Sequence, residues 1–288
     1  MEILPLCADS LGTRSMATFV KTEDITIIID PAVSLAPRRY GLPPHTIEIE
    51  RLEADWKKIS DFSRKADVVI ITHYHYDHHS PKRNLEIYDG KFVFIKHPTD
   101  HINFSQRKRA SIFQKAIRDL AEEIIFADNR EFIFGNTRIR FSPPVPHGEN
   151  SKLGYVIQVL IEENNQRFLF TSDVEGPILE DQVNFILNMK PNYVLLDGPM
   201  TYMLGYRYST QSLNMAIKNI ERIISMKSLK KLIIDHHFMR DINWEERIMP
   251  LIRYRNTLIQ SSAEFLGLEN NLLEARRKYL WYGNKEKL

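Results

Sequence analysis

Ile70-Ile71-Thr72-His73-Tyr74-His75-Tyr76-Asp77-His78-His79 is the stretch that decides the fold. It includes the end of the apolar run 68–71, which has the length of a buried strand. The run is followed by imidazoles and a carboxylate in the spacing His-x-His-x-Asp-His. Neutral imidazole and carboxylate are the ligands that divalent transition metals prefer. The stretch therefore predicts a metal centre at the end of a strand.

The spacing within this motif favours two ions over one. Four ligands from so short a segment cannot all reach a single ion without strain, but they can serve two ions if alternate residues point to opposite sides. We therefore expect His73 and His75 to bind one ion, and Asp77 and His78 to bind the other. A solvated histidine-rich loop is the alternative. The agreement of spacing, residue types and preceding strand favours the metal site.

The composition is that of an ordinary globular protein, with 43% hydrophobic and 26% charged residues in 288. The formal net charge of +2 does not support general nucleic-acid binding, although it leaves nucleic acid open as a partner of a local patch. The single cysteine, Cys7, excludes an internal disulfide and suits a reducing cytosol. We expect neither a signal peptide nor a membrane span, and therefore a cytoplasmic protein.

Further polar motifs follow other strand-like runs. Asp30 ends the apolar run 27–29, and His147 precedes Gly148 after a predicted hairpin over 131–141. A second predicted hairpin ends in Thr171-Ser172-Asp173, and Asp235-His236-His237 follows the apolar run 231–234. Each motif places ligand-type side chains directly after a strand, as the first motif does.

His73-x-His75-x-Asp77-His78 after a strand resembles the signature of the metallo-beta-lactamase fold superfamily. The motifs at Asp30, His147, Asp173 and His236 follow in that family's order, so the resemblance covers about residues 1–240. Within the superfamily the chain resembles an archaeal branch of metal-dependent hydrolases. The resemblance implies an α/β (α+β) fold, a four-layer αββα sandwich in which helices cover two mixed sheets. The sequence alone supports only alternating strands and helices.

The same resemblance implies the remaining metal ligands. His147 would complete the first ion's ligands, His236 would complete the second ion's, and Asp173 would bridge both. A carboxylate suits the bridging position because it can bind two cations and offset their charge. The full expected ligand set is His73, His75, Asp77, His78, His147, Asp173 and His236.

Two adjacent histidines compete for the last ligand position. We choose His236 because it is the second residue after its apolar run, as His73 is after 68–71. His237 would then donate a proton to a leaving group, or simply pack. Asp30 would orient the histidine motif from behind, or cap the turn before Pro31.

We expect one domain over 1–288, with helical insertions at about 46–66 and 103–123 and a helical C-terminal tail at about 243–280. Helical spacing of apolar residues supports both insertions, as at Ile49, Leu52 and Trp56. The insertions and the tail fall outside the family resemblance. The sequence does not indicate an oligomeric state.

The expected function is that of a dinuclear metal-dependent hydrolase that uses a metal-bridging hydroxide. Zinc is the default metal, and manganese or iron also suits these ligands. The candidate catalytic residues are Asp77, Asp173 and His237. An oxidoreductase of the flavo-diiron kind would need a flavin domain that does not fit in this length. A non-catalytic metal-binding module of the same fold is the other alternative.

The substrate is the least determined part of the prediction. Ser10, Arg14 and Tyr202 are candidates for substrate contact, although local hydrogen bonds or packing would explain each of them as well. Basic residues favour a phosphodiester or other phosphoester over a carboxylic ester, lactone or amide, and these residues are Arg38, Arg39, Arg107, Lys108 and Arg109.

Overall fold

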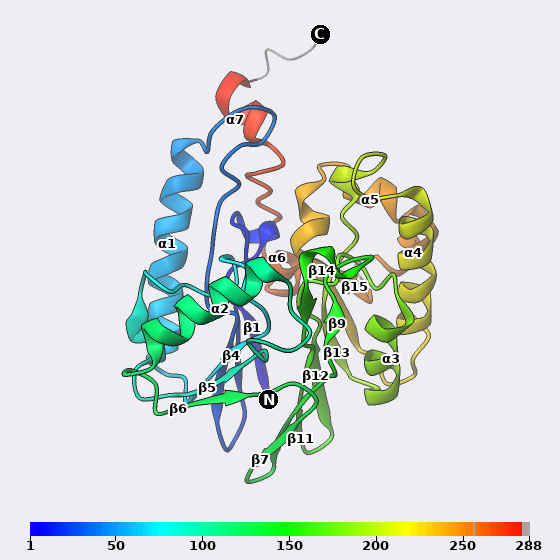
Figure 1. Ribbon diagram of the computed structural model, residues 1–288. Helices are drawn as coiled ribbons and strands as arrows, with labels where there is room; N and C mark the ends of the chain where they lie inside the picture. The colour runs from blue at the N-terminus through cyan, green and yellow to red at the C-terminus, as the bar shows by residue number, and fades with distance from the viewer. Residues whose placement is uncertain (256, 284–288) are drawn as a thin grey trace.

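Two β-sheets lie face to face in the structure, a computed structural model that describes residues 1–255 and 257–283 (Figure 1). Helices α1 (Thr46–Ser63) and α2 (Phe104–Ile117) cover the outer side of the first sheet. Helices α3 (Glu180–Met189) and α4 (Thr210–Ile224) cover the outer side of the second. The order of layers is therefore helix, sheet, sheet, helix, which confirms the predicted αββα sandwich.

The first sheet is mixed. Its first three strands pair antiparallel, and its third to sixth strands pair parallel. Within the described residues its strand order is β1 (Glu2–Pro5), β2 (Thr18–Lys21), β3 (Thr26–Ile29), β4 (Val68–Ile71), β5 (Phe92–Ile95) and β6 (Glu123–Phe126).

The second sheet is also mixed. A hairpin, β9 (Val145–Pro146) with β10 (Tyr155–Val156), lies beside it. From the centre of this sheet to one edge, β12, β13, β14 and β15 run parallel. Across the described residues its order is β7 (Glu131–Phe134), β8 (Thr137–Phe141), β11 (Val159–Glu163), β12 (Gln166–Phe170), β13 (Tyr193–Asp197), β14 (Lys231–Asp235) and β15 (Ile259–Gln260).

Strand β4 shows why continuous apolar runs form the centre of each sheet. Val69 and Ile71 pack toward α1 and α2, whereas Val68 and Ile70 pack toward the second sheet. Alternate side chains of a strand point to opposite faces, and both faces of this strand are buried. A strand buried on both faces needs apolar residues at every position, which is what the run 68–71 provides.

The carboxyl ends of the parallel strands meet at one edge of the sandwich. Asp197 at the end of β13 lies in register with Asp235 at the end of β14, and Asp173 follows the neighbouring strand β12. Polar residues placed just after parallel strands come together at such an edge, where open sheets bind their ligands. The histidine motif reaches the same edge from β4 of the first sheet.

Two predicted segments differ from the structure. The helix expected over about 103–123 ends at Ile117, because Glu123–Phe126 pairs with β5 as strand β6. The tail expected to be helical over about 243–280 consists of short helices and turns, and Ile259–Gln260 adds a strand to the second sheet. Its pieces are α5 (Trp244–Arg247), a 3₁₀ turn (Met249–Tyr254), α6 (Ser262–Phe265) and α7 (Arg277–Tyr282).

The first insertion agrees with its prediction, since α1 spans Thr46–Ser63. The assignment of 1–288 to a single domain remains a prediction, and residues 284–288 lie outside the described residues. Among the described residues, no helix combines the length and the apolar character needed to cross a membrane.

Candidate metal centre

The histidine motif is held in place by the aspartate that follows β3. Asp30 has a left-handed backbone conformation (φ 48°), and its carboxylate accepts hydrogen bonds from the backbone N–H of Thr72 at 2.8 Å and from the Thr72 hydroxyl at 2.5 Å. The same carboxylate lies 2.9 Å from Nδ1 of His78. Asp30 therefore fixes the loop at the end of β4 from behind, as the resemblance implied.

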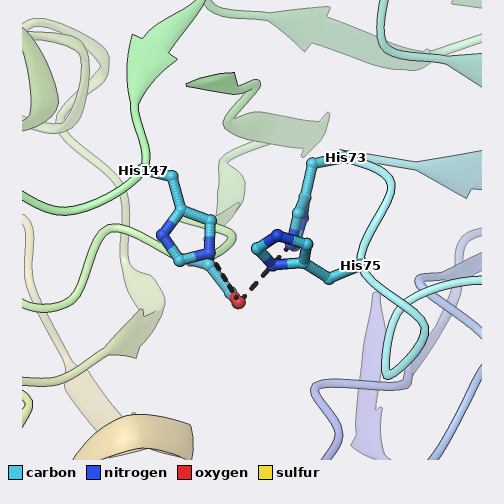
Figure 2. Close-up of side chains that lie close together, drawn as sticks. His73, His75 and His147 are labelled. Carbon is cyan, nitrogen blue, oxygen red and sulfur yellow. Dashed lines mark ion pairs between the residues drawn. The ribbon is translucent and has the colours of Figure 1, made fainter. Parts of the chain in front are cut away.

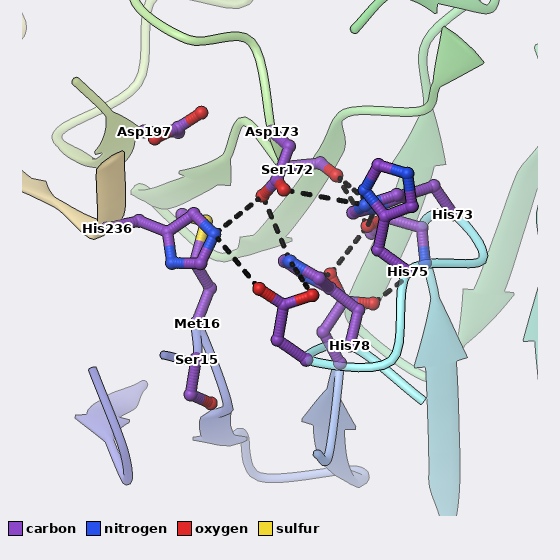
Figure 3. Close-up of polar contacts among 12 residues, drawn as sticks. Ser15, Met16, His73, His75, His78, Ser172, Asp173, Asp197 and His236 are labelled. Atoms are coloured by element: carbon purple, nitrogen blue, oxygen red, sulfur yellow. Dashed lines mark hydrogen bonds and ion pairs between the residues drawn. The ribbon is translucent and has the colours of Figure 1, made fainter. Parts of the chain in front are cut away.

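Asp173 lies at the centre of the cluster and turns its two carboxylate oxygens to different neighbours (Figure 3). Oδ2 lies 3.5 Å from Nε2 of His73 and 3.3 Å from Nε2 of His147. Oδ1 lies 3.1 Å from Nε2 of His78 and 3.4 Å from Nε2 of His236. One carboxylate thus faces two separate groups of imidazoles.

Among the described residues, four groups of side chains could hold a metal ion, and two of them correspond to the expected ligand sets. The histidine set is His73, His75 and His147, whose rings face one another across the gap between two segments (Figure 2). The mixed set is Asp77, His78 and His236. The ligand atoms of each set lie within 4.8 Å of one another, and those of the histidine set also lie within that distance of an Asp173 oxygen.

The histidine set contains the residues that we expected to bind the first ion. The mixed set contains those that we expected to bind the second ion, including His236. His237 instead lies with Nδ1 at 3.0 Å from each oxygen of Asp197, and its backbone N–H donates to the same carboxylate. His237 belongs to a further group with Asp173 and His236, so it remains close enough to act at the same centre.

Several buried polar atoms in the cluster have close neighbours but form no hydrogen bond within the described part of the chain. They include Nε2 of His73, Nε2 of His78, Nε2 of His147 and Oδ1 of Asp173. An unpaired buried polar atom costs free energy, so atoms of this kind call for an explanation. All four are donor atoms that a transition metal accepts, and they converge on the same small volume. The donor set therefore fits metal ions.

The outer ring nitrogens of the ligands are held by neighbouring polar groups. Nδ1 of His236 lies 2.9 Å from Asp9 Oδ2, as Nδ1 of His78 lies near Asp30. Nδ1 of His73 lies 3.2 Å from the Ser172 hydroxyl. Holding Nδ1 in this way leaves Nε2 to face the metal position, which is how histidine ligands are usually oriented.

The electrostatics of the two sets differ. Burial lowers the pKa of His73 to about 3 and lowers the pKa of His75 well below its usual value, whereas the pKa of His147 is raised by Asp173 although burial opposes this. In the mixed set, burial also opposes the charged imidazolium, but the Asp173 carboxylate outweighs it and raises the pKa of His236 to about 10. The pKa of His78 is raised in the same way by Asp173 and Asp30.

Some of the strained backbone positions of the chain lie at this centre. Ser172, Glu175 and His236 all have left-handed backbone conformations, with φ of 58°, 52° and 59°. Such conformations cost free energy in residues other than glycine and gather at functional sites. Here they aim side chains at the ends of β12 and β14 toward the cluster.

A cavity of about 580 Å³ opens beside the ligands. Ligands from the histidine set line it, as do His237 and Tyr202. Its charged lining is mixed, and consists of Arg14, Lys152, Arg207 and Arg240 with Glu149 and Glu175.

The predicted substrate contacts lie in different places. Tyr202 and Arg14 line the cavity, although both Nε and Nη2 of Arg14 pair with Glu274. Ser10 is fully buried, donates its hydroxyl to Asp235 at 2.5 Å and does not line the cavity. Its role in the structure is therefore the local one that we gave as the alternative.

The basic residues that the sequence singled out do not line the cavity. Arg107 and Arg109 donate instead to backbone carbonyls of Thr99 and Tyr74. Arg39 contacts two residues of the lining, because its guanidinium lies over the ring of Tyr202 and donates to the Arg240 carbonyl.

Sequence reasoning missed several residues of this site. Asp9 holds His236 from a position 227 residues away in the chain, and Arg240 donates to Asp9 at 2.9 Å. Glu175 lies with Oε1 at 3.5 Å from Nδ1 of His147. Neither Asp9 nor Glu175 belongs to a sequence motif. Arg240, in contrast, lies at the end of the 3₁₀ turn that begins with His236, so its position close to the last histidine motif could have indicated it.

Solved structures similar to this chain share its fold. A possible metal-dependent hydrolase from Veillonella parvula matches with a TM-score of 0.54 at 15% identity, over 87% of this chain and 94% of that one. The metallo-beta-lactamase fold protein YhfI from Bacillus subtilis matches with a TM-score of 0.52 at 11% identity, over 90% and 94%. Zn(2+)-bound PqqB from Methylobacterium extorquens matches with a TM-score of 0.51 at 10% identity, over 91% and 98%. The protein therefore has the metallo-beta-lactamase fold.

Similar archaeal sequences show the family of the chain. A UPF0282 protein of Korarchaeum cryptofilum is 53% identical over 284 residues, which cover 98% of this chain and 94% of the relative. Another, from Sulfurisphaera tokodaii, is 48% identical over 98% and 93%. The chain belongs to the UPF0282 family. No family model matches it.

Proposed function

We propose that this protein is a dinuclear metal-dependent hydrolase, with zinc as its metal and a phosphodiester as its substrate. One observation carries the proposal: Asp173 presents Oδ2 to the histidine set and Oδ1 to the mixed set. A carboxylate divided in this way suits a bridge between two cations. Zinc is supported by the mixture of imidazole and carboxylate donors, and by the zinc-bound state of the similar PqqB.

The chain's own residues would prepare the reaction. When bound, two such ions supply Lewis acidity and lower the pKa of a water molecule toward neutrality. Asp77 would complete the mixed set, and Asp173 would contribute one carboxylate oxygen to each set. Asp197 holds Nδ1 of His237, so that Nε2 is left to exchange a proton with a leaving group in the cavity.

The charge of the cavity supports a phosphodiester over a neutral ester. Four basic side chains line the cavity, against two acidic ones outside the ligand sets. Burial raises the pKa of one of those two, Glu175, to about 7, so that its negative charge is partly lost near neutrality. A carboxylic ester, lactone or amide has no negative charge at the bond that is cleaved for these basic side chains to offset.

A cytoplasmic location is part of the same proposal. The one cysteine of the chain, Cys7, is fully buried and unpaired. A free thiol of this kind suits a reducing compartment.

Hydrolysis of matched chromogenic esters tests the proposal. The protein would be reconstituted with zinc, manganese or iron in turn and assayed with bis(p-nitrophenyl) phosphate and with p-nitrophenyl acetate. We expect zinc-dependent cleavage of the phosphodiester, lost in Asp173→Asn and kept in Asp181→Asn, which changes an exposed aspartate of α3. Equal activity of Asp173→Asn and wild type would refute it, as would cleavage of the acetate alone.

A further inference from the structure

We propose that Arg14 and Arg240 form a subsite for an oxyanion of the substrate, a phosphate or carboxylate group beside the bond that is cleaved. The inference rests on the proposed hydrolase function, since it describes the cavity next to that metal centre. The substrate would therefore be an anion, and guanidinium groups of the protein would recognise its charge together with the metal ions.

Arg240 lies directly against the mixed set. Its Nη2 is 3.1 Å from Nε2 of His236 and 3.7 Å from Oδ2 of Asp77. Its Nε donates to Asp9, which in turn holds Nδ1 of His236. The side chain is almost fully buried and still lines the cavity. A substrate group bound at the mixed set would therefore meet this guanidinium.

Arg14 brings a second guanidinium to the same wall of the cavity. Nε and Nη2 form a two-pronged pair with Glu274, both at 2.6 Å. The positive charge of Arg240 is close enough to oppose the charge on Arg14. Two like charges in a largely buried position repel each other, and an anion placed between them would remove that repulsion.

Each guanidinium keeps a donor for a ligand. Among the described residues, Nη1 of Arg14 and Nη1 of Arg240 have no hydrogen-bond partner, and neither is among the buried unpaired atoms. Both residues line the cavity, so each brings a guanidinium with an unused donor to it. Guanidinium donors in this arrangement suit the oxygens of a carboxylate or phosphate.

The charge balance around the two residues also favours an anion. Arg39 donates to the backbone carbonyl of Arg240, and its guanidinium acts electrostatically on Glu274. Three arginines thus share two carboxylates, Asp9 and Glu274, outside the metal ligands. The acidic side chains of the lining are Glu149 and Glu175; Arg240 acts electrostatically on Glu175, and burial raises the pKa of Glu175 to about 7, which weakens its negative charge near neutrality.

Binding of simple anions tests the subsite without any need for turnover. Inorganic phosphate and acetate would be titrated calorimetrically into the full-length protein, both zinc-loaded and after chelation. The double variant Arg14→Gln/Glu274→Gln removes the guanidinium of Arg14 and also the carboxylate of Glu274, so that no charged group is left without its partner. We expect phosphate or acetate to bind the wild type in both states, and the double variant to bind it about tenfold or more weakly, the effect of losing one charge-assisted hydrogen bond.

A matched control separates this effect from the general loss of an arginine pair. Arg83 and Glu53 form a similar two-pronged pair and do not line the cavity. Arg83→Gln/Glu53→Gln should leave anion affinity unchanged. If the Arg14 double variant does not fold, Arg14→Lys takes its place. This variant keeps the positive charge but loses the planar guanidinium group, so it should still weaken anion binding several-fold.

The outcomes decide the inference and remain distinct from those for the proposed function. Failure of wild type to bind either anion would overturn the subsite, as would equal affinities of wild type and a folded Arg14 variant. Anion binding that depends on Arg14, in a protein that cleaves no ester, would leave the subsite standing and remove the hydrolase. The tighter of the two anions identifies whether the recognised group is a phosphate or a carboxylate.

Discussion

The two ligand sets share one aspartate and differ in what supports them. In the mixed set, buried carboxylates hold the outer ring nitrogens, Asp30 for His78 and Asp9 for His236. In the histidine set, a serine hydroxyl holds His73, and Glu175 approaches His147 only to 3.5 Å. Buried carboxylates thus hold both outer ring nitrogens of the mixed set, whereas in the histidine set a hydroxyl and a more distant carboxylate take this place. The difference teaches that one carboxylate can face two groups of imidazoles whose surroundings differ.

Removal of the shared residue should have the largest effect. Asp173→Asn removes the charge that offsets both cations, so we expect hydrolysis to fall by about a thousandfold or more, with loss of metal from both sets. Steady-state kinetics and elemental mass spectrometry on the same sample measure both quantities. Loss of metal from one set only would contradict the proposal that Asp173 binds the ions of both sets.

A substitution beside the sets should separate chemistry from metal binding. His237 lines the cavity outside both sets, so His237→Gln should lower kcat about a hundredfold while both ions are retained. The check is kcat with metal content determined in parallel. A variant that loses an ion would show that His237 is a ligand and not a proton carrier.

Much of this arrangement follows from the sequence, and the reason is local. His73, Asp173 and His236 all stand just after apolar strands, so their positions at one edge are visible in the sequence pattern. Asp9 and Arg240 support His236 through contacts across 227 and 4 residues, and the longer contact leaves no pattern in the chain. The sequence pattern did not predict strand β6 for a similar reason. The strand is stabilised by its pairing with β5, which the helical spacing before it does not indicate.

The outer partners give a direct comparison between the sets. Asp30→Asn should weaken metal binding by the mixed set about 10- to 100-fold, since it removes a carboxylate from a ligand histidine. Ser172→Ala removes only a hydroxyl from His73 and should weaken the histidine set less. Competition with a chromophoric chelator measures each affinity. A larger effect of Ser172→Ala would reverse the proposed contrast.

The pH dependence of metal binding should also differ. Without metal, the raised pKa values of His78 and His236 leave the mixed set protonated at pH 7, so a metal ion must displace those protons. The lowered pKa values of His73 and His75 leave those two rings neutral at that pH. As pH falls from about 8 to 6, we expect the mixed-set ion to be lost first, with about a tenfold loss of affinity per pH unit for each proton displaced. Metal content after dialysis at each pH checks this order.

The smallest effect should be on stability, in the arginine network behind the mixed set. Arg14 lowers the pKa of Glu274 to about 2 although burial opposes this, so folding favours the ionised form. That stability is present above the unfolded pKa and is lost as pH falls from about 5 to 2. We expect a loss on the order of 1 kcal/mol across this window, because Arg14 is 23% exposed and screened by solvent. Urea unfolding of metal-free wild type and Glu274→Gln measures the contribution of Glu274 as the difference between their pH dependences, because other carboxylates such as Asp173 titrate in both proteins.

The count of bound ions tests the central claim most directly. Elemental mass spectrometry would be applied to reconstituted wild type, to His147→Ala, which breaks the histidine set, and to His236→Ala, which breaks the mixed set. We predict about two ions per chain in the wild type and about one in each variant, with Asp173→Asn below the wild type. One ion or none in folded, reconstituted wild type would contradict the claim that Asp173 bridges two metals.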